Sequence, residues 1–359
     1  MNQDDGTSPP EPWLRVHGPS ADGEPGRGGF LQDAPPRPLL PQEVCLPSIS
    51  SGSSFLFCRT CSDEIILVLS KSCRHSLQLL DVEGSRDVTD GCIAHLTNFR
   101  LRELNIFNTN ISVTGLAALL QTARGLQALT RGVRICQALD YQAIVNEATW
   151  VDQKQLRLQV FQACERQHFH TDHEMALVYN ACPDIRKMIF KFQPELFSSY
   201  LQLAVFDKLQ HFETWGGEYE GSGLGKLLEE VGNSLLSLHL CHVEEISHLS
   251  LIHLLSSCPA LKELKLENCS YMVDTVNPYT EEQLEQLNEE VPHLMELRAV
   301  RVVNKMPLQM LLMVLRKALN IVTVENDSAE DMTDITFLHL LLTNRMLRLQ
   351  QLAVMQSKL

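Results

Sequence analysis

The sequence predicts an α/β fold, a leucine-rich-repeat solenoid shaped as a curved horseshoe with parallel strands on its concave face and helices outside. The main observation is an apolar frame, LxxLxL, whose clearest copies start at Leu77, Leu101, Leu235 and Leu261. The intervals from Leu77 to Leu101 and from Leu235 to Leu261 are nearly equal. Both lie inside the roughly 20–29-residue period of this repeat class.

The N-terminal stretch 1–54 differs in composition from the rest of the chain. It is dense in proline, glycine, serine and aspartate, as in SPPEPW and SADGEPGRGG. Such a stretch holds too little apolar surface to offset the entropy of ordering it. We therefore expect a disordered tail over 1–54 and the solenoid over 55–359.

The folded body should begin with a helix at Asp63, the helix of an incomplete repeat, because Ile65, Ile66 and Leu69 share a helical face. Each later frame should open as a strand, since residues at positions four and six point to the same side of an extended chain. A helix should follow each strand, as over 113–120 and 249–255. Weaker frames start at Ile185, Leu209, Leu319 and Leu349.

The array should be irregular at 133–184 and at 270–293. Arg131 stands where position six should be apolar, and no strand frame is recognisable in 133–184. The interval from Leu261 to Leu294 is long and contains an acidic segment. The array stops directly after a strand frame, so either a partner covers the last repeat or the chain is a shortened isoform.

Charge narrows the classes of partner. The 359 residues include 30 basic and 44 acidic side chains, a net charge of −14 that repels phosphate backbones and anionic membranes. We expect no nucleic-acid and no membrane partner. The sequence contains no run of eighteen apolar residues that could span a membrane and no apolar segment near Met1 that could direct secretion. We therefore expect the protein in the cytosol or nucleus. The 11 cysteines should then be thiols.

Three groups of residues could carry chemistry. Zinc could be held by Cys58, Cys61, Cys73 and His75, but their spacing is unusual, and we favour ordinary core or pre-strand positions. The histidines at 168, 170 and 173 fit a solvated loop better than a metal site. The glycine-rich 216–225 fits a tight reversal better than a nucleotide loop. With no catalytic constellation, we expect no enzyme, no metal and no cofactor.

Outward positions beside frame positions four and six should form the binding surface on the concave side. Acidic residues outnumber basic ones there, which suggests a partner with a basic surface, and two aromatic residues could anchor it. The predicted protein-binding residues are Asp81, Glu83, Glu103, Asn105, Phe107, Lys187, Lys191, His211, Glu213, Trp215, His239, Glu263, Lys265, Glu267, Glu296 and Arg298. Alternatively, Phe107 and Trp215 pack against neighbouring repeats.

Three segments resemble the cysteine-containing leucine-rich repeats of F-box/LRR proteins: SCPALKELKLENC (257–269), ACPDIRKMIF (181–190) and SLQLLDVEGSRDVTDGCIAHL (76–96). Cys182 and Cys258 each stand three residues before a strand frame, and Val88-Thr89-Asp90 resembles the family's ITD step into a helix. The resemblance extends loosely over 63–359, but no F-box is recognisable.

This resemblance implies a protein-interaction scaffold that serves as the substrate-recognition subunit of a cullin-RING (SCF-type) ubiquitin ligase, with cullin-ligase components among its partners. The alternative belongs to a different class of function. The chain could be a scaffold or inhibitor that blocks its partner directly, with no link to ubiquitination. Repeat architecture fixes the shape of a surface but not its ligand.

Overall fold

A computed structural model describes the body of the chain. It describes residues 55–123, 125–130, 134–146, 155–162, 171–272, 286, 289, 291, 293–303, 306–326 and 351–354. All of them belong to one unit, Pro47–Leu359. The predicted tail, 1–54, lies outside the described residues.

The strands form one sheet in which every neighbouring pair is parallel and the spatial order follows the sequence. The strands are β1 (Phe55–Phe57), β2 (Leu79–Asp81), β3 (Glu103–Asn105), β4 (Ala128–Thr130), β5 (Val160–Gln162), β6 (Lys187–Lys191), β7 (His211–Trp215), β8 (Ser237–Cys241), β9 (Glu263–Glu267), β10 (Ala299–Val303), β11 (Thr323–Asn326) and β12 (Gln351–Val354). Strands in sequence order need a crossover segment between each pair.

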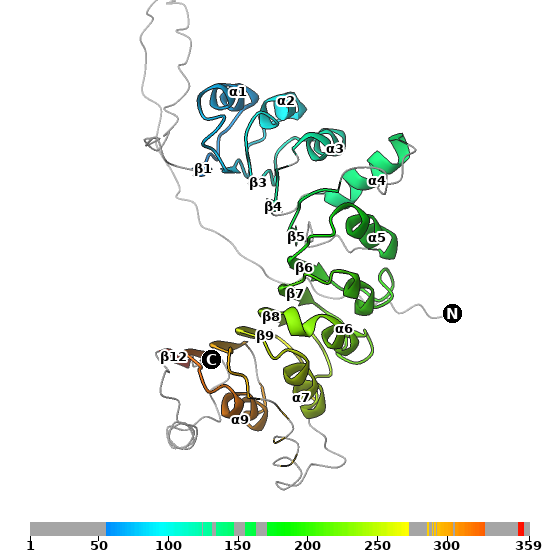
Figure 1. The fold of residues 1–359 in the computed structure, drawn as a ribbon, viewed down its shortest axis with the longest axis vertical. Coiled ribbons are helices and arrows are strands. Elements are labelled where there is room, and N and C mark those ends of the chain that lie inside the picture. The colour runs from blue at the N-terminus through cyan, green and yellow to red at the C-terminus, as the bar shows by residue number, and fades with distance from the viewer. Residues whose placement is uncertain are drawn as a thin grey trace, which may run out of the picture. The chain divides into compact units, whose positions relative to one another are not determined.

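Those crossovers are mostly helical. They are α1 (Asp63–Ser72), η1 (Asp90–Cys92), α2 (Ile93–Leu96), α3 (Val113–Thr122), α4 (Ile135–Asn146), α5 (Asp172–Ala181), η3 (Tyr200–Val205), α6 (Leu224–Val231), η4 (Gly232–Ser234), α7 (His248–Ser257) and α9 (Leu308–Lys317). The helices lie on the outer side of the array and the strands on the inner, concave side (Figure 1). The predicted α/β leucine-rich-repeat solenoid is confirmed. Among the helices of the described part, none combines the length and apolar character needed to cross a membrane.

The core lies between the sheet and the helices. Frame positions four and six of β8 pair in register with those of β9, Leu238 with Leu264 and Leu240 with Leu266, and all four side chains are fully buried. Leu251 and its neighbours on α7 close the core from the helical side. Stacked repeats therefore bury what one strand and one helix would leave exposed.

Left-handed backbone ends several strands at the same place in the repeat. The residue two beyond position six has a positive φ at Gly84, Asn108, His242 and Asn268. In the glycine-rich 216–225, Gly216 stands at this place and has a φ of 84°, and Gly217 and Gly223, elsewhere in the same loop, also have positive φ values (88° and 77°). Glycine adopts this conformation without steric cost, so the prediction of a reversal is confirmed.

The first element of the solenoid differs from the prediction. The strand β1 precedes α1 and pairs with β2, Leu56 lying beside Leu80. The array therefore does not begin with the helix of an incomplete repeat. The strand is short, and just Leu56 of its members is buried, so the sequence signal is one apolar position rather than a frame.

A strand also forms in 133–184, where the sequence predicted none. Phe161 of β5 lies in register with Met188 of β6, and Leu158 and Phe161 are buried at frame positions one and four. The upstream β4 forms as well, with Leu126 and Leu129 in the core. The predicted disturbance at Arg131 lies outside the described residues.

Two frames near the C-terminal end of the array were misregistered. β11 pairs Val324 with Val300, so its frame runs from Ile321 and not from Leu319, whose side chain is 37% exposed. β10 pairs Val300 with Leu264, which places its frame start at the buried Leu297 and not at Leu294.

Candidate protein-binding face

Most of the predicted binding residues lie on the concave face of the sheet. The members inside strands are Asp81, Glu103, Asn105, Lys187, Lys191, His211, Glu213, Trp215, His239, Glu263, Lys265 and Glu267. The side chains that alternate with them belong to the core, as the buried Leu238 and Leu240 of β8 illustrate. Glu83 and Phe107 follow directly after the buried Val82 and Ile106, beyond the ends of β2 and β3.

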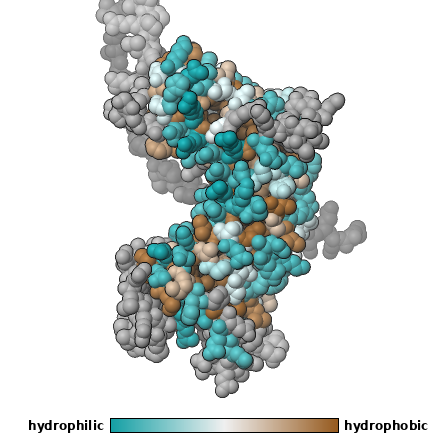
Figure 2. Space-filling view, in the orientation of Figure 1, coloured by the Kyte–Doolittle hydropathy of each residue, from teal (hydrophilic) through white to brown (hydrophobic). Residues whose placement is uncertain are grey.

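Glu296 and Arg298 are exposed but precede β10. Their placement beside positions four and six was wrong because the β10 frame starts later in the chain than predicted. Ala299 and Arg301 are the β10 residues that lie in register with Glu263 and Lys265. On the side shown in Figure 2, hydrophilic and hydrophobic residues of the described part are interspersed.

The N-terminal part of the face contains a cavity of about 840 Å³. Its lining includes the carboxylates Asp81, Glu83 and Glu103 and one cation, Arg59, together with Phe57, so acidic groups outnumber basic ones there. Phe57 is on the edge strand β1 in register with Asp81, and the residue is 67% exposed. The cavity therefore combines negative charge with an accessible aromatic surface.

Asn105 organises the acidic wall of this cavity. Its Nδ2 donates to Asp81 Oδ2 at 3.1 Å and to Glu83 Oε2 at 2.9 Å. These contacts leave Asn105 buried, at 6% exposure, although the sequence predicted an accessible outward residue. Asn105 thus holds two carboxylates close together despite their mutual repulsion, and it contributes little accessible surface of its own.

A charged network occupies the middle of the face, across β7, β8 and β9. The His239 ring lies between two carboxylates, with Nδ1 3.4 Å from Glu213 Oε2 and Nε2 3.2 Å from Glu267 Oε2. Lys265 Nζ is 2.5 Å from the same Glu267 oxygen. Hydrogen bonding to His239 lowers the pKa of Glu213, and hydrogen bonding to Lys265 lowers the pKa of Glu267, so both carboxylates remain ionised at neutral pH.

Trp215 is partly exposed, at 36%, beside this network. Its Nε1 donates to Glu213 Oε1 at 3.1 Å, and Lys191 Nζ lies 5.8 Å from its ring centroid. The ring also lies against His242, with centroids 5.9 Å apart. The indole therefore packs on its neighbours, as one of the two sequence alternatives expected, and still presents part of its surface.

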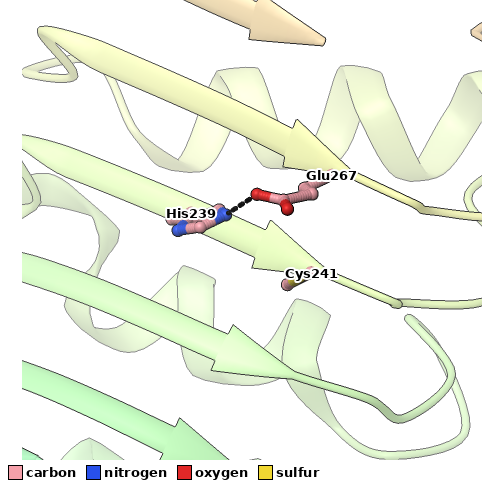
Figure 3. A group of neighbouring side chains, drawn as sticks. All are labelled: His239, Cys241 and Glu267. Atoms are coloured by element: carbon pink, nitrogen blue, oxygen red, sulfur yellow. Dashed lines mark hydrogen bonds and ion pairs between the residues drawn. The ribbon is translucent and has the colours of Figure 1, made fainter. Parts of the chain in front are cut away.

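The network also brings together side chains of the types that bind metals. His239, Cys241 and Glu267 offer ligand atoms within 4.8 Å of one another (Figure 3). The sequence prediction included His239 and Glu267 but missed Cys241, which is buried although it occupies an outward position. Strand alternation could have identified Cys241 as an outward position, the next one after His239, but not its register with Glu267, which depends on strand pairing.

The other metal-like residues are placed differently. Among the described residues, Cys58, Cys61, Cys73 and His75 do not form a group of three or more neighbouring metal-ligand atoms. Cys61 is buried, and burial raises the pKa of its thiol to about 12. His173 lies 3.5 Å from Asp140 Oδ1, and His168 and His170 lie outside the described residues.

Among known proteins, similarity is found to solved structures, at low sequence identity. No protein-family description matches the chain, and no curated protein matches it. Among solved structures, similarity extends to a TLR13–ssRNA13 complex (12% identity, TM-score 0.38), covering 77% of this chain but only 43% of that one. LegL7 of Legionella pneumophila, described as a leucine-rich-repeat-containing protein, is 14% identical (TM-score 0.41), with 75% of this chain and 88% of that one covered. For a yeast Rad7–Elc1 complex the identity is 13%, the TM-score 0.34, and the coverage 78% and 74%. The fold assignment itself rests on the strand order and register described above.

Proposed function

We propose that this protein is a non-catalytic scaffold that holds a protein partner on its concave face. The observation that carries the proposal is the 840 Å³ cavity between β1 and β3, which joins three carboxylates to an exposed phenylalanine ring. A carboxylate cluster favours cationic groups, and an aromatic face attracts the same groups through its quadrupole. We infer that the partner inserts an arginine or lysine side chain into this cavity.

A second anchor for the partner is the Trp215 ring. Large aromatic side chains surrounded by polar groups carry much of the energy of protein interfaces. Trp215 is held in place by Glu213 and lies beside Lys191, so little side-chain entropy is lost when a partner covers it. The two anchors belong to one continuous sheet, from β2 to β7, and a partner segment crossing the strands can contact both.

The proposal is tested by comparing what the full chain and its variants capture from cells by affinity purification and mass spectrometry. We expect Glu83→Lys and Trp215→Ala to lose the same partner, because the first reverses charge in the cavity and the second removes the aromatic anchor. Purified partner should then bind at least about ten-fold more weakly to each variant, as loss of an interface anchor typically requires.

Matched controls lie on the helical side. Glu230→Lys makes the same charge change at an exposed position of α6, and Leu249→Ala truncates an apolar side chain of α7 that is 47% exposed. Both controls should retain the partner, and circular dichroism melting should show all four variants folded. Equal loss with the control variants, or full retention with both concave-face variants, would refute the proposed face.

A link to ubiquitin ligation is a second candidate. It is favoured by the resemblance of 76–96, 181–190 and 257–269 to F-box/LRR repeats, in which Cys182 and Cys258 end helices α5 and α7. On this hypothesis, cullin-ligase components co-purify with the chain, and ubiquitination of the captured partner falls when the chain is depleted. On the alternative of a blocking scaffold, the partner is captured and its ubiquitination does not change.

A further inference from the structure

The centre of the concave face brings three different ligand types together on two neighbouring strands. His239 and Cys241 are successive outward residues of β8. Glu267 of β9 lies in register with Cys241. Figure 3 shows the His239 ring, the Cys241 sulfur and the Glu267 carboxylate in this group, with the dashed contact joining His239 to Glu267.

These side chains supply nitrogen, sulfur and oxygen, the donor set that tetrahedral zinc accepts in proteins. Bonds of about 2.0–2.3 Å to zinc place ligand atoms roughly 3.5 Å apart in a tetrahedral site. The three atoms here lie within 4.8 Å of one another, so small side-chain rotations would complete the geometry. β8 and β9 are held in place by the hydrogen-bond ladder of the sheet, so the rotations involve the side chains alone.

Glu213 provides an independent indication. Its Oε2 lies 3.4 Å from His239 Nδ1, the ring nitrogen that faces away from Glu267. Metal-binding histidines usually donate their second ring N–H to a carboxylate, which fixes the tautomer and leaves the other nitrogen a free lone pair. A metal-bound His239 would keep its proton on Nδ1, toward Glu213, and its Nε2, which contacts Glu267 Oε2 at 3.2 Å in the metal-free protein, would turn its lone pair to the ion.

Of the three ligand residues, His239 and Glu267 are accessible in part. Cys241 is fully buried, whereas the side chains of His239 and Glu267 are 13% and 26% exposed. An ion would therefore sit above the sulfur, bounded by the ring and the carboxylate. Its fourth coordination position would point away from the sheet, toward solvent or a bound protein.

Lys265 opposes cation binding at this place. Its ammonium lies 2.5 Å from Glu267 Oε2 and would have to leave that oxygen when a metal arrives. The charge of Lys265 also repels a dication at short range. Removal of this charge should consequently strengthen metal binding, an effect that loss of folding cannot imitate.

We propose that His239 Nε2, Cys241 Sγ and Glu267 bind one zinc ion, with Glu213 as the positioning residue for His239. When the bonds to zinc form, the Cys241 thiol proton and the proton that His239 Nε2 shares with Glu267 pass to solvent, and the ammonium of Lys265 turns away from Glu267. The fourth ligand is water in the free protein.

The test is titration of the full, reduced chain with Co²⁺, followed by displacement with Zn²⁺ and competition against a chromophoric chelator. We expect tetrahedral cobalt bands and a thiolate-to-cobalt charge-transfer band at one equivalent, both abolished by Cys241→Ser. Glu213→Gln should weaken binding about 10- to 100-fold, as for other partners of metal-bound histidine. Lys265→Met should strengthen binding on the order of ten-fold.

Two variants are matched controls. His211→Ala removes another histidine of the concave face, and Cys58→Ser removes a cysteine of the N-terminal group; neither should change the cobalt spectrum or the affinity. The proposal is overturned if the charge-transfer band persists in Cys241→Ser, if it is lost in Cys58→Ser instead, or if Lys265→Met fails to raise the affinity. No partner protein is needed, so this outcome is separate from that of the proposed function.

Discussion

Thr214 occupies a core position of β7 that leucine fills in the next two repeats, in register with Leu240. The residue is fully buried, and its hydroxyl is hydrogen-bonded to the Tyr200 hydroxyl, which in turn donates to the Gly216 carbonyl at 2.9 Å. Tyr200 also stacks on Phe192, with ring centroids 4.5 Å apart. A buried hydroxyl is tolerated here because the chain of hydrogen bonds ends on a backbone acceptor.

This arrangement predicts coupling between the two hydroxyls. Tyr200→Phe should lower the free energy of unfolding by about 1–3 kcal/mol, because the buried Thr214 hydroxyl loses its partner. In Thr214→Val the loss should be smaller, since Tyr200 still donates to Gly216. Urea denaturation followed by circular dichroism should give a double variant that costs less than the sum of the single ones. Additive costs would show that the hydroxyls do not interact.

At the scale of elements, acidic residues at helix starts join consecutive repeats. The Asp63 carboxylate, at the start of α1, accepts from the Thr89 backbone N–H at 2.8 Å and from its hydroxyl at 2.5 Å. Asp90, at the start of η1, accepts in the same way from Ser112, the N-cap of α3. The helix beginning predicted at Val88-Thr89-Asp90 is confirmed, with Thr89 as N-cap. The negative charge of each carboxylate also interacts favourably with the positive N-terminal end of the helix dipole.

The bridge predicts a graded effect of substitutions at Asp63. Asp63→Ala should lower the free energy of unfolding by about 1.5–3 kcal/mol, the range for hydrogen bonds to charged groups. Asp63→Asn should cost less, because an amide oxygen still accepts one bond. Glu64→Ala, at the exposed next residue, should stay within about 0.5 kcal/mol of the parent protein in the same urea titration. If the control costs as much as Asp63→Ala, the bridge is not the cause.

The strand frames that the sequence predicted correctly are those in which period and leucine pattern agree. β8 and β9 follow one another at an ordinary repeat interval, with leucine at all three frame positions. The interval from Leu129 of β4 to Phe161 of β5 exceeds the roughly 20–29-residue period of the class, and phenylalanine replaces leucine, so neither signal remained. Near β11 the apolar run offers two frames, from 319 or from 321, and pairing with β10 decides between them. Inter-strand register is a tertiary property that local alternation does not contain.

The candidate sites, too, were predictable from the sequence only in part. Alternation identified Glu213, His239 and Glu267 as outward residues because of their places beside the core positions of their strands. It could not identify the closeness of Cys241 to Glu267, which depends on the pairing of two strands. The exposed ring of Phe57 was missed because β1 itself was missed.

At the scale of the whole molecule, the solenoid contains cysteines at equivalent places far apart along the array. Cys73, Cys182 and Cys258 end helices α1, α5 and α7 and are buried. Burial raises the pKa of the Cys182 and Cys258 thiols to about 12. Because each repeat contacts only its neighbours, such an array can open in one region while another stays folded. The thiols therefore report on separate regions of one molecule.

Alkylation of the reduced protein at pH 8 should consequently spare Cys182 and Cys258 and modify the half-buried Cys58. Because burial raises the pKa of both thiols to about 12, they stay protonated at pH 8, and the thiolate is the reacting species. Added urea should remove the protection of each thiol at the concentration where its own repeats open, as resolved by peptide mass spectrometry. A common midpoint for both would show that the array unfolds as one cooperative unit. Modification of Cys182 in native buffer as fast as Cys58 would contradict its burial in the core.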